Sequence, residues 1–286
     1  MLIAQITDIH IGFDAGDPEE LNVRRLRAVV ARLVDGPNRP DLVLLSGDLT
    51  EFGDAASYAR LLELLAPLDM PLRVMTGNHD QREALLAAFP QTINHDGFVQ
   101  YVEDLDGLRL IALDTLEPGR HGGGFCDVRA AWLAARLAEA PKAPTLIAMH
   151  HPPIVSGLGW LDGAAEELWI LRFREAIAGH GQVQAIVSGH LHRTIHTRFA
   201  GVPLTVVPST AAVVALDLNP ADPAAPDGRP TITAEPPGYA LHRWDGAQVL
   251  THFESVAVEG EWPVLARYDA AFQPVVRQIA EERGDA

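Results

Sequence analysis

The fold is decided by the stretch Leu42-Val43-Leu44-Leu45-Ser46-Gly47-Asp48, in which an apolar run ends in a small polar turn and a carboxylate. Four consecutive apolar residues before a turn are typical of a buried β-strand. Gly47 removes side-chain bulk, so the backbone can turn and the Asp48 carboxylate can project from the strand end. A single Gly-Asp turn is common and does not by itself indicate a fold or a site. The pattern becomes informative when it recurs along the chain.

The pattern does recur along the first two hundred residues. Apolar runs predict buried strands at residues 2–6, 42–45, 72–75, 108–113, 145–149, 185–187 and 204–207. Apolar residues at three- and four-residue steps predict helices at 19–34, 55–65, 82–89, 128–138 and 166–178. The alternation of strands and helices predicts an α/β fold.

Polar residues follow most of these strands. Strand ends of an α/β sheet converge on one crevice, so side chains far apart in the sequence can meet there. The strand-end residues are Asp8, His10, Asp48, Asn78, His79, Asp80, Asp114, His150, His151, His190 and His192. Most are residue types that bind metal, so the sequence predicts a metal site.

Composition narrows the class of protein. The chain has 286 residues, 48% apolar and 21% charged, which predicts one main soluble domain with an appendage. No apolar stretch reaches the roughly 18 residues of a membrane span, and the N-terminal run is too short for a signal peptide. The net charge of −16 disfavours a long nucleic acid as partner but allows a small phosphate ligand. Cys126 is the only cysteine, which excludes an internal disulfide and favours a reducing cytoplasm.

The character of the sequence changes from Ala211 onward. Residues 217–237 are rich in proline, and residues 239–244 and 248–255 resemble a β-hairpin around Asp245-Gly246. We expect a main domain over 1–210, a Pro-rich insert and hairpin over 211–262, and a C-terminal helix or tail over 263–286. A long Pro-rich loop is typical of a lid, a binding loop or an oligomer contact. The edge of the hairpin could pair across a two-fold axis, so we expect a homodimer or a higher homo-oligomer.

The spacing of the polar residues indicates how they could share ions. Asp8 and His10 are two residues apart in an extended segment, so they point the same way; His190 and His192 repeat this geometry. A turn aspartate followed by a surface histidine is the alternative for the first pair alone. His150 and His151 are adjacent and face opposite ways, so we expect only His150, nearer the strand, to bind directly.

The segment Gly77-Asn78-His79-Asp80 is the most specific of the clusters, because it combines an amide oxygen, an imidazole and a carboxylate. His79 could lie just outside the metals and protonate a departing oxygen, with Asp80 holding its ring. A purely structural histidine is the alternative. We favour the catalytic role.

The candidate ligands are all oxygen or nitrogen donors: Asp8, His10, Asp48, Asn78, His150, His190 and His192. One zinc ion takes three or four ligands. Seven donors, with Asp48 as a bridging carboxylate, suit two ions about 3.5–4 Å apart, which is the usual arrangement for displacement at phosphorus. The sequence therefore predicts metal-assisted hydrolysis of a phosphoester.

In order and context, these motifs resemble those of the calcineurin-like metallophosphoesterases over about residues 1–210. The most similar branch is the bacterial class III branch, which includes cyclic-nucleotide phosphodiesterases and glycerophosphodiesterases. The resemblance implies a four-layer α/β/β/α sandwich of two mixed sheets, with a C-terminal β-hairpin and Pro-rich appendage. It also implies two divalent ions, chosen from Mn, Fe, Zn and Co, and an in-line attack on phosphorus by a hydroxide that bridges them.

The resemblance also assigns residues to roles. One ion would be held by Asp8, His10, Asp48 and His192. The other would be held by Asp48, Asn78, His150 and His190. Asp48, Asn78 and His79 would be catalytic: Asp48 as the bridge, Asn78 as a phosphate contact and His79 as the acid for the leaving alkoxide.

The leading hypothesis is a dinuclear phosphodiesterase that hydrolyses a small diester, such as cAMP, a 2',3'-cyclic nucleotide or a glycerophosphodiester. The alternatives are a phosphomonoesterase on the same scaffold and a non-catalytic interaction module. A non-catalytic module would be expected to lack some of the metal ligands, and none of the expected ligands is missing. No set of phosphate-clamping arginines accompanies the motifs, and Arg193 is the nearest candidate. This favours a diester monoanion over a monoester dianion.

The remaining polar residues have simpler interpretations. We expect Asp114 to make structural hydrogen bonds and His121, within the glycine-rich segment 119–124, to lie in an ordinary loop although it could line the substrate pocket. Surface or core positions are expected for His95, His180, His196, His242 and His252, and a packing role for Cys126.

Overall fold

The computed structural model describes residues 1–222, 224–225, 227–264, 266–267, 270 and 273–283. The first sheet has the strand order β13-β12-β1-β2-β3. Its strands are β1 (Leu2–Ile6), β2 (Leu42–Ser46), β3 (Leu72–Met75), β12 (Gly238–Trp244) and β13 (Val249–Ser255). The second sheet has the order β4-β5-β6-β7-β9-β8. Its strands are β4 (Tyr101–Leu105), β5 (Leu108–Leu113), β6 (Thr145–Met149), β7 (Val183–Ser188), β8 (Ile195–Phe199) and β9 (Val202–Val206).

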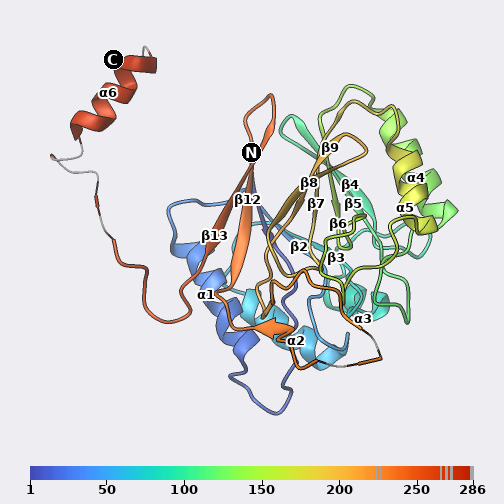
Figure 1. Cartoon of the computed structure of the whole chain (residues 1–286). Helices are drawn as coiled ribbons and strands as arrows, with labels where there is room; N and C mark the ends of the chain where they lie inside the picture. Colours follow the sequence, from blue (N-terminus) through green and yellow to red (C-terminus); the bar gives the residue numbers. More distant parts are fainter. Residues whose placement is uncertain (223, 226, 265, 268–269, 271–272, 284–286) are drawn as a thin grey trace.

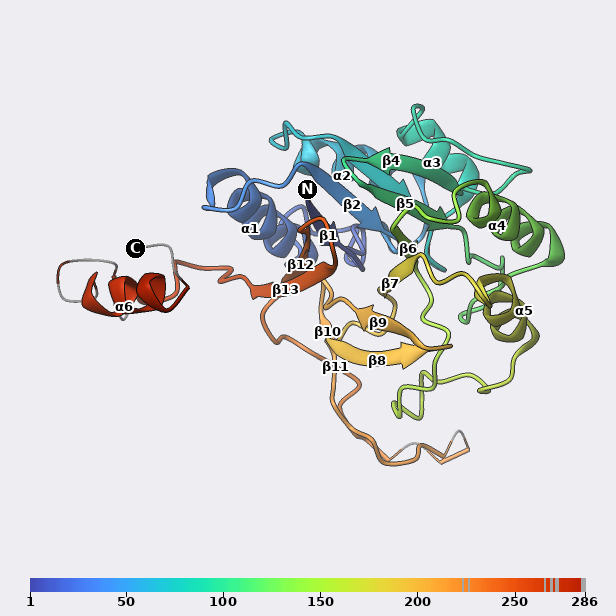
Figure 2. The same cartoon turned by 90° about the horizontal axis from the view of Figure 1, so that it is seen from above.

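The helices and a short ribbon complete the described part of the chain. The helices are α1 (Leu21–Asp35), α2 (Ala55–Leu65), α3 (Arg82–Ala88), α4 (Asp127–Glu139), α5 (Leu168–Ile177) and α6 (Gln273–Arg283). The ribbon consists of β10 (Val213–Val214) and β11 (Ile232–Thr233), which pair antiparallel. Helix α6 lies apart from the two sheets (Figures 1 and 2).

Side-chain alternation in the strands explains why the two sheets pack face to face. In β2, Val43 and Leu45 belong to the core that packs against α1 and α2. Leu42 and Leu44 point the other way and pack against strands of the second sheet, including Leu146 of β6. The second sheet repeats this pattern, with its outer face covered by α4 and α5. Figure 2 shows the resulting layers, and the predicted α/β/β/α sandwich is confirmed.

The central strands of both sheets are parallel. β1, β2 and β3 run in one direction, and β5, β6, β7 and β9 are likewise parallel to one another. Their carboxyl ends therefore lie along one edge of the sandwich, and the polar clusters that follow them are brought together there.

Two strands of the second sheet, β4 and β8, were not predicted from the sequence because they lie at its two edges. β4 carries Glu103 and Asp104, and β8 carries His196, Thr197 and Arg198. An edge strand is exposed on one side, so its residues do not form the continuous apolar run by which buried strands are recognised.

The predicted hairpin is present and joins the first sheet. β12 pairs antiparallel with β1, Leu2 opposite Arg243, and Tyr239 and Leu241 enter the core beneath α1. The sheet therefore extends beyond residue 210, while the division into 1–210, 211–262 and 263–286 stays a prediction. No helix among the described residues is long and apolar enough to cross a membrane.

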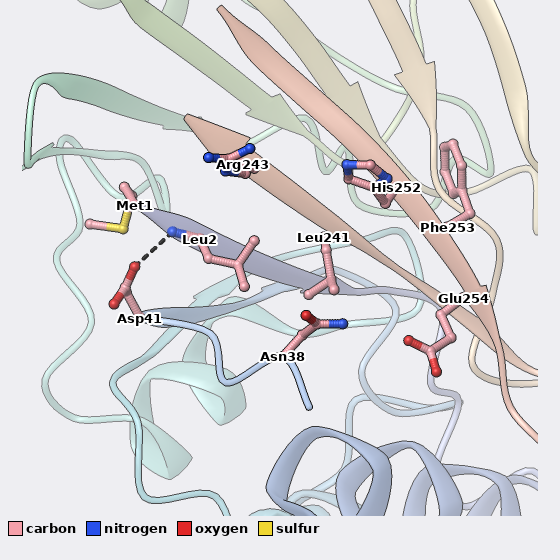
Figure 3. A pocket seen from close by; sticks show the side chains of 9 residues that line it. All are labelled: Met1, Leu2, Asn38, Asp41, Leu241, Arg243, His252, Phe253 and Glu254. Carbon is pink, nitrogen blue, oxygen red and sulfur yellow. Dashed lines mark hydrogen bonds between the residues drawn. The ribbon is translucent and has the colours of Figure 1, made fainter. Parts of the chain in front are cut away.

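An open groove of about 510 Å³ lies over the β12–β13 edge (Figure 3). Its wall includes Asn38, Arg243, His252 and Glu254, and the Leu2 amide donates to Asp41 Oδ2 there at 2.7 Å. None of the predicted metal ligands lines this groove. The chemistry of the predicted site therefore lies elsewhere.

His242, on β12, is a buried core histidine, as expected. Its Nε2–H donates to Gln5 Oε1 at 2.9 Å, and its Nδ1 lies 2.9 Å from the hydroxyl of Thr251. Burial lowers the pKa of His242 to about 4. Between pH 6.5 and 4 the unfolded chain binds a proton at this position that the folded chain does not, so the folded state loses stability as the pH falls. The loss contributed by His242 should reach about 3 kcal/mol at pH 4.

Urea unfolding of the wild-type protein and of His242→Gln at pH 7 and pH 4.5 measures this contribution. The glutamine keeps a donor for Gln5 but does not titrate, so the variant should lose less stability between the two pH values. Equal losses in the two proteins would show that His242 does not couple folding to pH.

Candidate metal centre

The turns that carry the predicted ligands have an unusual backbone. Five ligands have positive φ angles near the left-handed region: Asp8 (53°), His10 (51°), Asp48 (50°), His190 (69°) and His192 (52°). Non-glycine residues seldom adopt this conformation, which costs about 1 kcal/mol or more at each position. Such residues cluster at functional sites, because surrounding structure is needed to hold them there.

Two glycines allow these turns to approach each other closely. A methyl group on Gly77 would lie 2.2 Å from Asp48 Oδ1. A methyl group on Gly189 would lie 2.1 Å from Thr7 Oγ1 and 2.7 Å from Asp8 Oδ2. The glycines before Asn78 and His190 are therefore required by the packing of one strand end on another.

The first group of ligands comprises Asp8, His10 and His192, whose donor atoms lie within 4.8 Å of one another. His10 Nε2 lies 3.2 Å from His192 Nε2, and His192 Nε2 lies 3.4 Å from Asp8 Oδ1. Asp48 Oδ2 is 3.6 Å from His10 Nε2 and extends this group. Two imidazole nitrogens facing two carboxylates at these distances can share one cation.

Asp48 also belongs to a second group, with Asp8 and His150. His150 Nε2 lies 3.2 Å from Asp48 Oδ2. Asn78 Oδ1 and His190 Nδ1 are buried and accept no hydrogen bond from any described residue. A divalent ion would satisfy such lone pairs, since amide oxygen, imidazole nitrogen and carboxylate oxygen are its usual ligands. The side chains therefore fit the predicted second ion.

Hydrogen bonds behind the ligands fix the orientation of three imidazoles. His10 Nδ1 lies 2.8 Å from Glu51 Oε2, His150 Nδ1 lies 2.9 Å from the carbonyl of Ser46, and His192 Nδ1 lies 2.7 Å from the carbonyl of Ala212. An acceptor at each Nδ1 keeps the proton on that nitrogen. Nε2 of each ring is then the nitrogen that faces the carboxylates, and when unprotonated it offers the lone pair that a metal ion requires.

The electrostatics of the cluster follow from burial and close opposite charges. Burial alone would raise the pKa of Asp48, but the neighbouring His150 and His10 outweigh burial and hold it well below its usual value. Burial lowers the pKa of His150, but the charges of Asp48 and Asp8 outweigh burial and raise it to about 9. The pKa of His190 is well below its usual value because of burial and its histidine neighbours. Metal binding therefore releases a proton from His150, whereas His190 is already neutral.

His79 lies beside the ligand groups, and its ring is not held by Asp80. Its Nδ1–H donates to the carbonyl of Glu51 at 2.8 Å, and its backbone N–H donates to Asp48 Oδ1 at 2.8 Å. Asp80 instead accepts from the Gly77 amide at 2.9 Å and fixes the turn. Since Nδ1 must keep its proton, Nε2 is the atom of His79 that can give one up.

Two further residues, His151 and Asp114, can be compared with their predicted roles. His151 Nδ1 lies 2.8 Å from Thr115 Oγ1, although its donor atoms also lie near those of His150 and His190. Asp114 is buried and accepts two hydrogen bonds from Arg82, at 2.7 and 2.8 Å, so its structural role is confirmed. Asp114 is therefore no ligand candidate.

The interpretation of His121 as an ordinary loop residue is wrong, and Arg193 can be compared with its suggested role. His121 is not an ordinary loop residue, because it lines the cavity, with Nδ1 3.5 Å from Asn78 Nδ2 and its ring 4.8 Å from that of His190. Arg193, the nearest candidate for a phosphate clamp, does not line the cavity, and its guanidinium donates to the Val214 carbonyl and pairs with Glu235 at 3.2 Å. The contacts of His121 and Arg193 could not be predicted from the sequence, because each joins loops that are far apart in the chain.

A cavity of about 700 Å³ opens over the ligands. His10, Asp48, His79, His190 and His192 form part of its floor. The described chain thus combines a cluster of metal-binding groups with a pocket large enough for a small organic molecule. This fold and site define a class of metal-dependent hydrolases.

The chain belongs to the calcineurin-like phosphoesterase family, whose model matches residues 1–194. It is 34% identical over 264 residues, 89% of each chain, to a probable cyclic nucleotide phosphodiesterase from Rhodopseudomonas palustris. It is 30% identical over 271 residues, 92% of this chain and 96% of the other, to a probable glycerophosphodiester phosphodiesterase from Arcobacter nitrofigilis. The predicted family, and with it a phosphoester hydrolase with a divalent metal centre, is confirmed.

The fold is also found in solved structures. A dimetal phosphatase from Danio rerio superposes with a TM-score of 0.60 over 88% of this chain and 98% of its own, at 16% identity. At this identity the likeness establishes the fold alone, and it agrees with the two-sheet sandwich.

Glu51, whose Oε2 lies 2.8 Å from His10 Nδ1, is a positioning residue for a candidate ligand that the sequence did not indicate. Its position three residues after Asp48 was the available signal. Glu51→Ala should weaken metal affinity about 10–100-fold, because His10 would lose the carboxylate that orients its ring. Glu51→Gln keeps an acceptor for His10, so its metal affinity should fall less than that of Glu51→Ala. Titration of both variants with Mn²⁺ measures the effect, and equal affinity in Glu51→Ala and the wild-type protein would contradict it.

Proposed function

We propose that this protein is a phosphodiesterase that uses two divalent ions to hydrolyse a small phosphodiester. The observation that carries the proposal is the position of Asp48, whose carboxylate lies within reach of both His10 and His150. One ion would then be held by Asp8, His10, Asp48 and His192. The other would be held by Asp48, Asn78, His150 and His190. Carboxylate, amide and imidazole ligands accommodate Mn, Fe, Zn or Co.

The ions, when bound, supply an activated water and neutralise charge on the phosphate oxygens. Residues of the chain would contact the phosphate and supply the proton for the leaving group. Asn78 Nδ2 lies 3.5 Å from Nδ1 of the cavity-lining His121, so its amide group could contact the phosphate while its buried Oδ1 holds an ion. His79, with Nδ1 anchored to the Glu51 carbonyl, can hold a proton on Nε2 and deliver it to the departing alkoxide.

The charge of the cavity wall favours a diester. Among the described residues that line the cavity there is no arginine or lysine, whereas Asp14, Asp17, Glu20 and Glu51 contribute negative charge. A monoester dianion depends on a cationic clamp more than a diester monoanion does. The relatives named as phosphodiesterases support the same choice, and a cyclic nucleotide or a glycerophosphodiester is the expected substrate.

Side-by-side hydrolysis of bis(p-nitrophenyl) phosphate and p-nitrophenyl phosphate tests the proposal. The protein is first treated with a chelator and then given Mn²⁺, Fe²⁺, Zn²⁺ or Co²⁺. We expect faster turnover of the diester. Faster turnover of the monoester would favour the phosphomonoesterase, and no turnover with any ion would favour the non-catalytic module.

Two further features belong to this proposal. The single cysteine agrees with a cytoplasmic location. The exposed edge of β13, the last strand of the first sheet, agrees with a homodimer or higher homo-oligomer formed by edge pairing. Light scattering of the purified protein measures the oligomeric state. A monomer at all concentrations would refute the proposed homo-oligomer.

A further inference from the structure

The cavity over the metal ligands has a polar floor but an apolar rim. Large apolar side chains stand exposed around it: Phe13 is 69% exposed, Ile232 49% and Trp160 37%. They come from three separate segments, namely the loop after β1, the β10–β11 ribbon and the loop after β6. Exposed apolar groups gathered around a concave site mark a surface that binds something.

The loop that carries Phe13 is held in place by a buried carboxylate. The Gly12 amide donates to Glu20 Oε1 at 2.8 Å, and the Asp14 amide donates to Glu20 Oε2 at 2.7 Å. Glu20 is only 3% exposed and also pairs with Arg60 at 3.3 Å. The backbone is thus held on both sides of Phe13, whose exposed ring lines the cavity.

The loop that carries Trp160 is fixed in a similar way. Asp162 accepts a hydrogen bond from the Gly157 amide at 2.7 Å. Gly159 packs against the Pro-rich segment, so that a methyl group there would lie 3.6 Å from Pro220 Cα. The Pro-rich segment therefore contacts the loop of Trp160 next to the aromatic residue.

The β10–β11 ribbon forms the third side of the rim. Its register places Val214 directly opposite Ile232, so both side chains lie on one face of the ribbon, and both line the cavity. β10 immediately precedes the Pro-rich segment 217–237, and β11 lies within it. Segments more than two hundred residues apart thus build one apolar rim.

Size and charge indicate what this rim accepts. A volume of about 700 Å³ is ample for a nucleoside and much larger than a glycerol group needs. The acidic side chains of Asp14 and Asp17 line the same cavity and disfavour a second anionic group on the ligand. Aromatic side chains stack well on planar rings, and such stacking tolerates different bases.

Resting on the proposed function, we infer that Phe13 and Trp160 form a subsite for a planar, apolar-faced alcohol group of the diester, such as a nucleoside. This subsite would select nucleoside diesters over diesters of small aliphatic alcohols. The two aromatic residues would act as specificity determinants and take no part in the chemistry at phosphorus.

Two substrates with the same leaving group test the inference: thymidine 5'-(p-nitrophenyl) phosphate and methyl p-nitrophenyl phosphate. With the Mn²⁺-loaded protein, kcat/KM should be at least about tenfold higher for the thymidine ester. Phe13→Ala and Trp160→Ala should each reduce this preference about tenfold, mainly through a higher KM for the thymidine ester. Phe52→Ala is the matched control, because Phe52 is 62% exposed but does not line the cavity. It should keep the wild-type preference.

The possible failures can be told apart. Equal kcat/KM for the two esters in the wild-type protein, or an unchanged preference in both alanine variants, would overturn the subsite while leaving the phosphodiesterase proposal intact. Hydrolysis of neither ester with Mn²⁺, Fe²⁺, Zn²⁺ or Co²⁺ would overturn both.

Discussion

The Asp48→Ala variant is expected to hydrolyse bis(p-nitrophenyl) phosphate at least about a thousandfold more slowly than the wild-type protein. Asp48 Oδ2 lies 3.6 Å from His10 Nε2 and 3.2 Å from His150 Nε2, so its carboxylate is the group common to both sets of ligands. Its removal should also lower the metal content, because each ion loses a ligand. Initial rates and metal analysis of the same preparations measure the two effects.

Asp104→Ala provides the matched control. The Asp104 carboxylate is 83% exposed on β4, away from the ligands, so its loss should change neither rate nor metal content. Asp48→Ala with more than a tenth of the wild-type rate would rule out Asp48 as the bridge.

The His79→Ala variant should retain its metal ions but slow the hydrolysis of esters with poor leaving groups about 100- to 10,000-fold. His79 Nε2 is the ring atom free to donate a proton, because Nδ1–H is bound to the Glu51 carbonyl. An alkoxide needs that proton when it departs, whereas p-nitrophenolate needs it much less. Rates on a dialkyl diester and on bis(p-nitrophenyl) phosphate, compared between variant and wild type, give the two losses.

His252→Ala serves as the control, since His252 lies on β13 in the groove of Figure 3 and lines no part of the catalytic cavity. Equal losses on good and poor leaving groups would argue against His79 as the acid. A loss of metal from His79→Ala would make it a ligand instead, as its closeness to His10 and Asp48 allows.

The sequence alone predicted the layered arrangement of the fold and the candidate ligands. Both predictions rest on the same physical feature, the burial of the parallel strands. Strands buried on both faces, such as β2 and β6, are recognisable as continuous apolar runs. Parallel strands must then end on one side, so the polar residues that follow them meet. The contacts of Asp48 with His10 and His150 are consequences of that topology.

Supporting contacts could not be predicted in the same way. The partner of the His79 ring is a backbone carbonyl, that of Glu51, which leaves no trace in the pattern of side chains. His121 reaches Asn78 only because its glycine-rich loop folds over the cavity. The apolar rim is formed by Phe13, Trp160 and Ile232. Phe13 and Ile232 are more than two hundred residues apart in the sequence, and the three residues belong to no periodic apolar pattern. Loop packing has no local sequence signal, so it emerges only in three dimensions.

The number of bound ions tests the central claim most directly. Protein treated with a chelator is titrated with Mn²⁺, and bound metal and bis(p-nitrophenyl) phosphate hydrolysis are measured at each step. We expect two ions per chain, with full activity only when the second has bound. Full activity at one ion per chain, with no further binding, would contradict a two-metal centre bridged by Asp48.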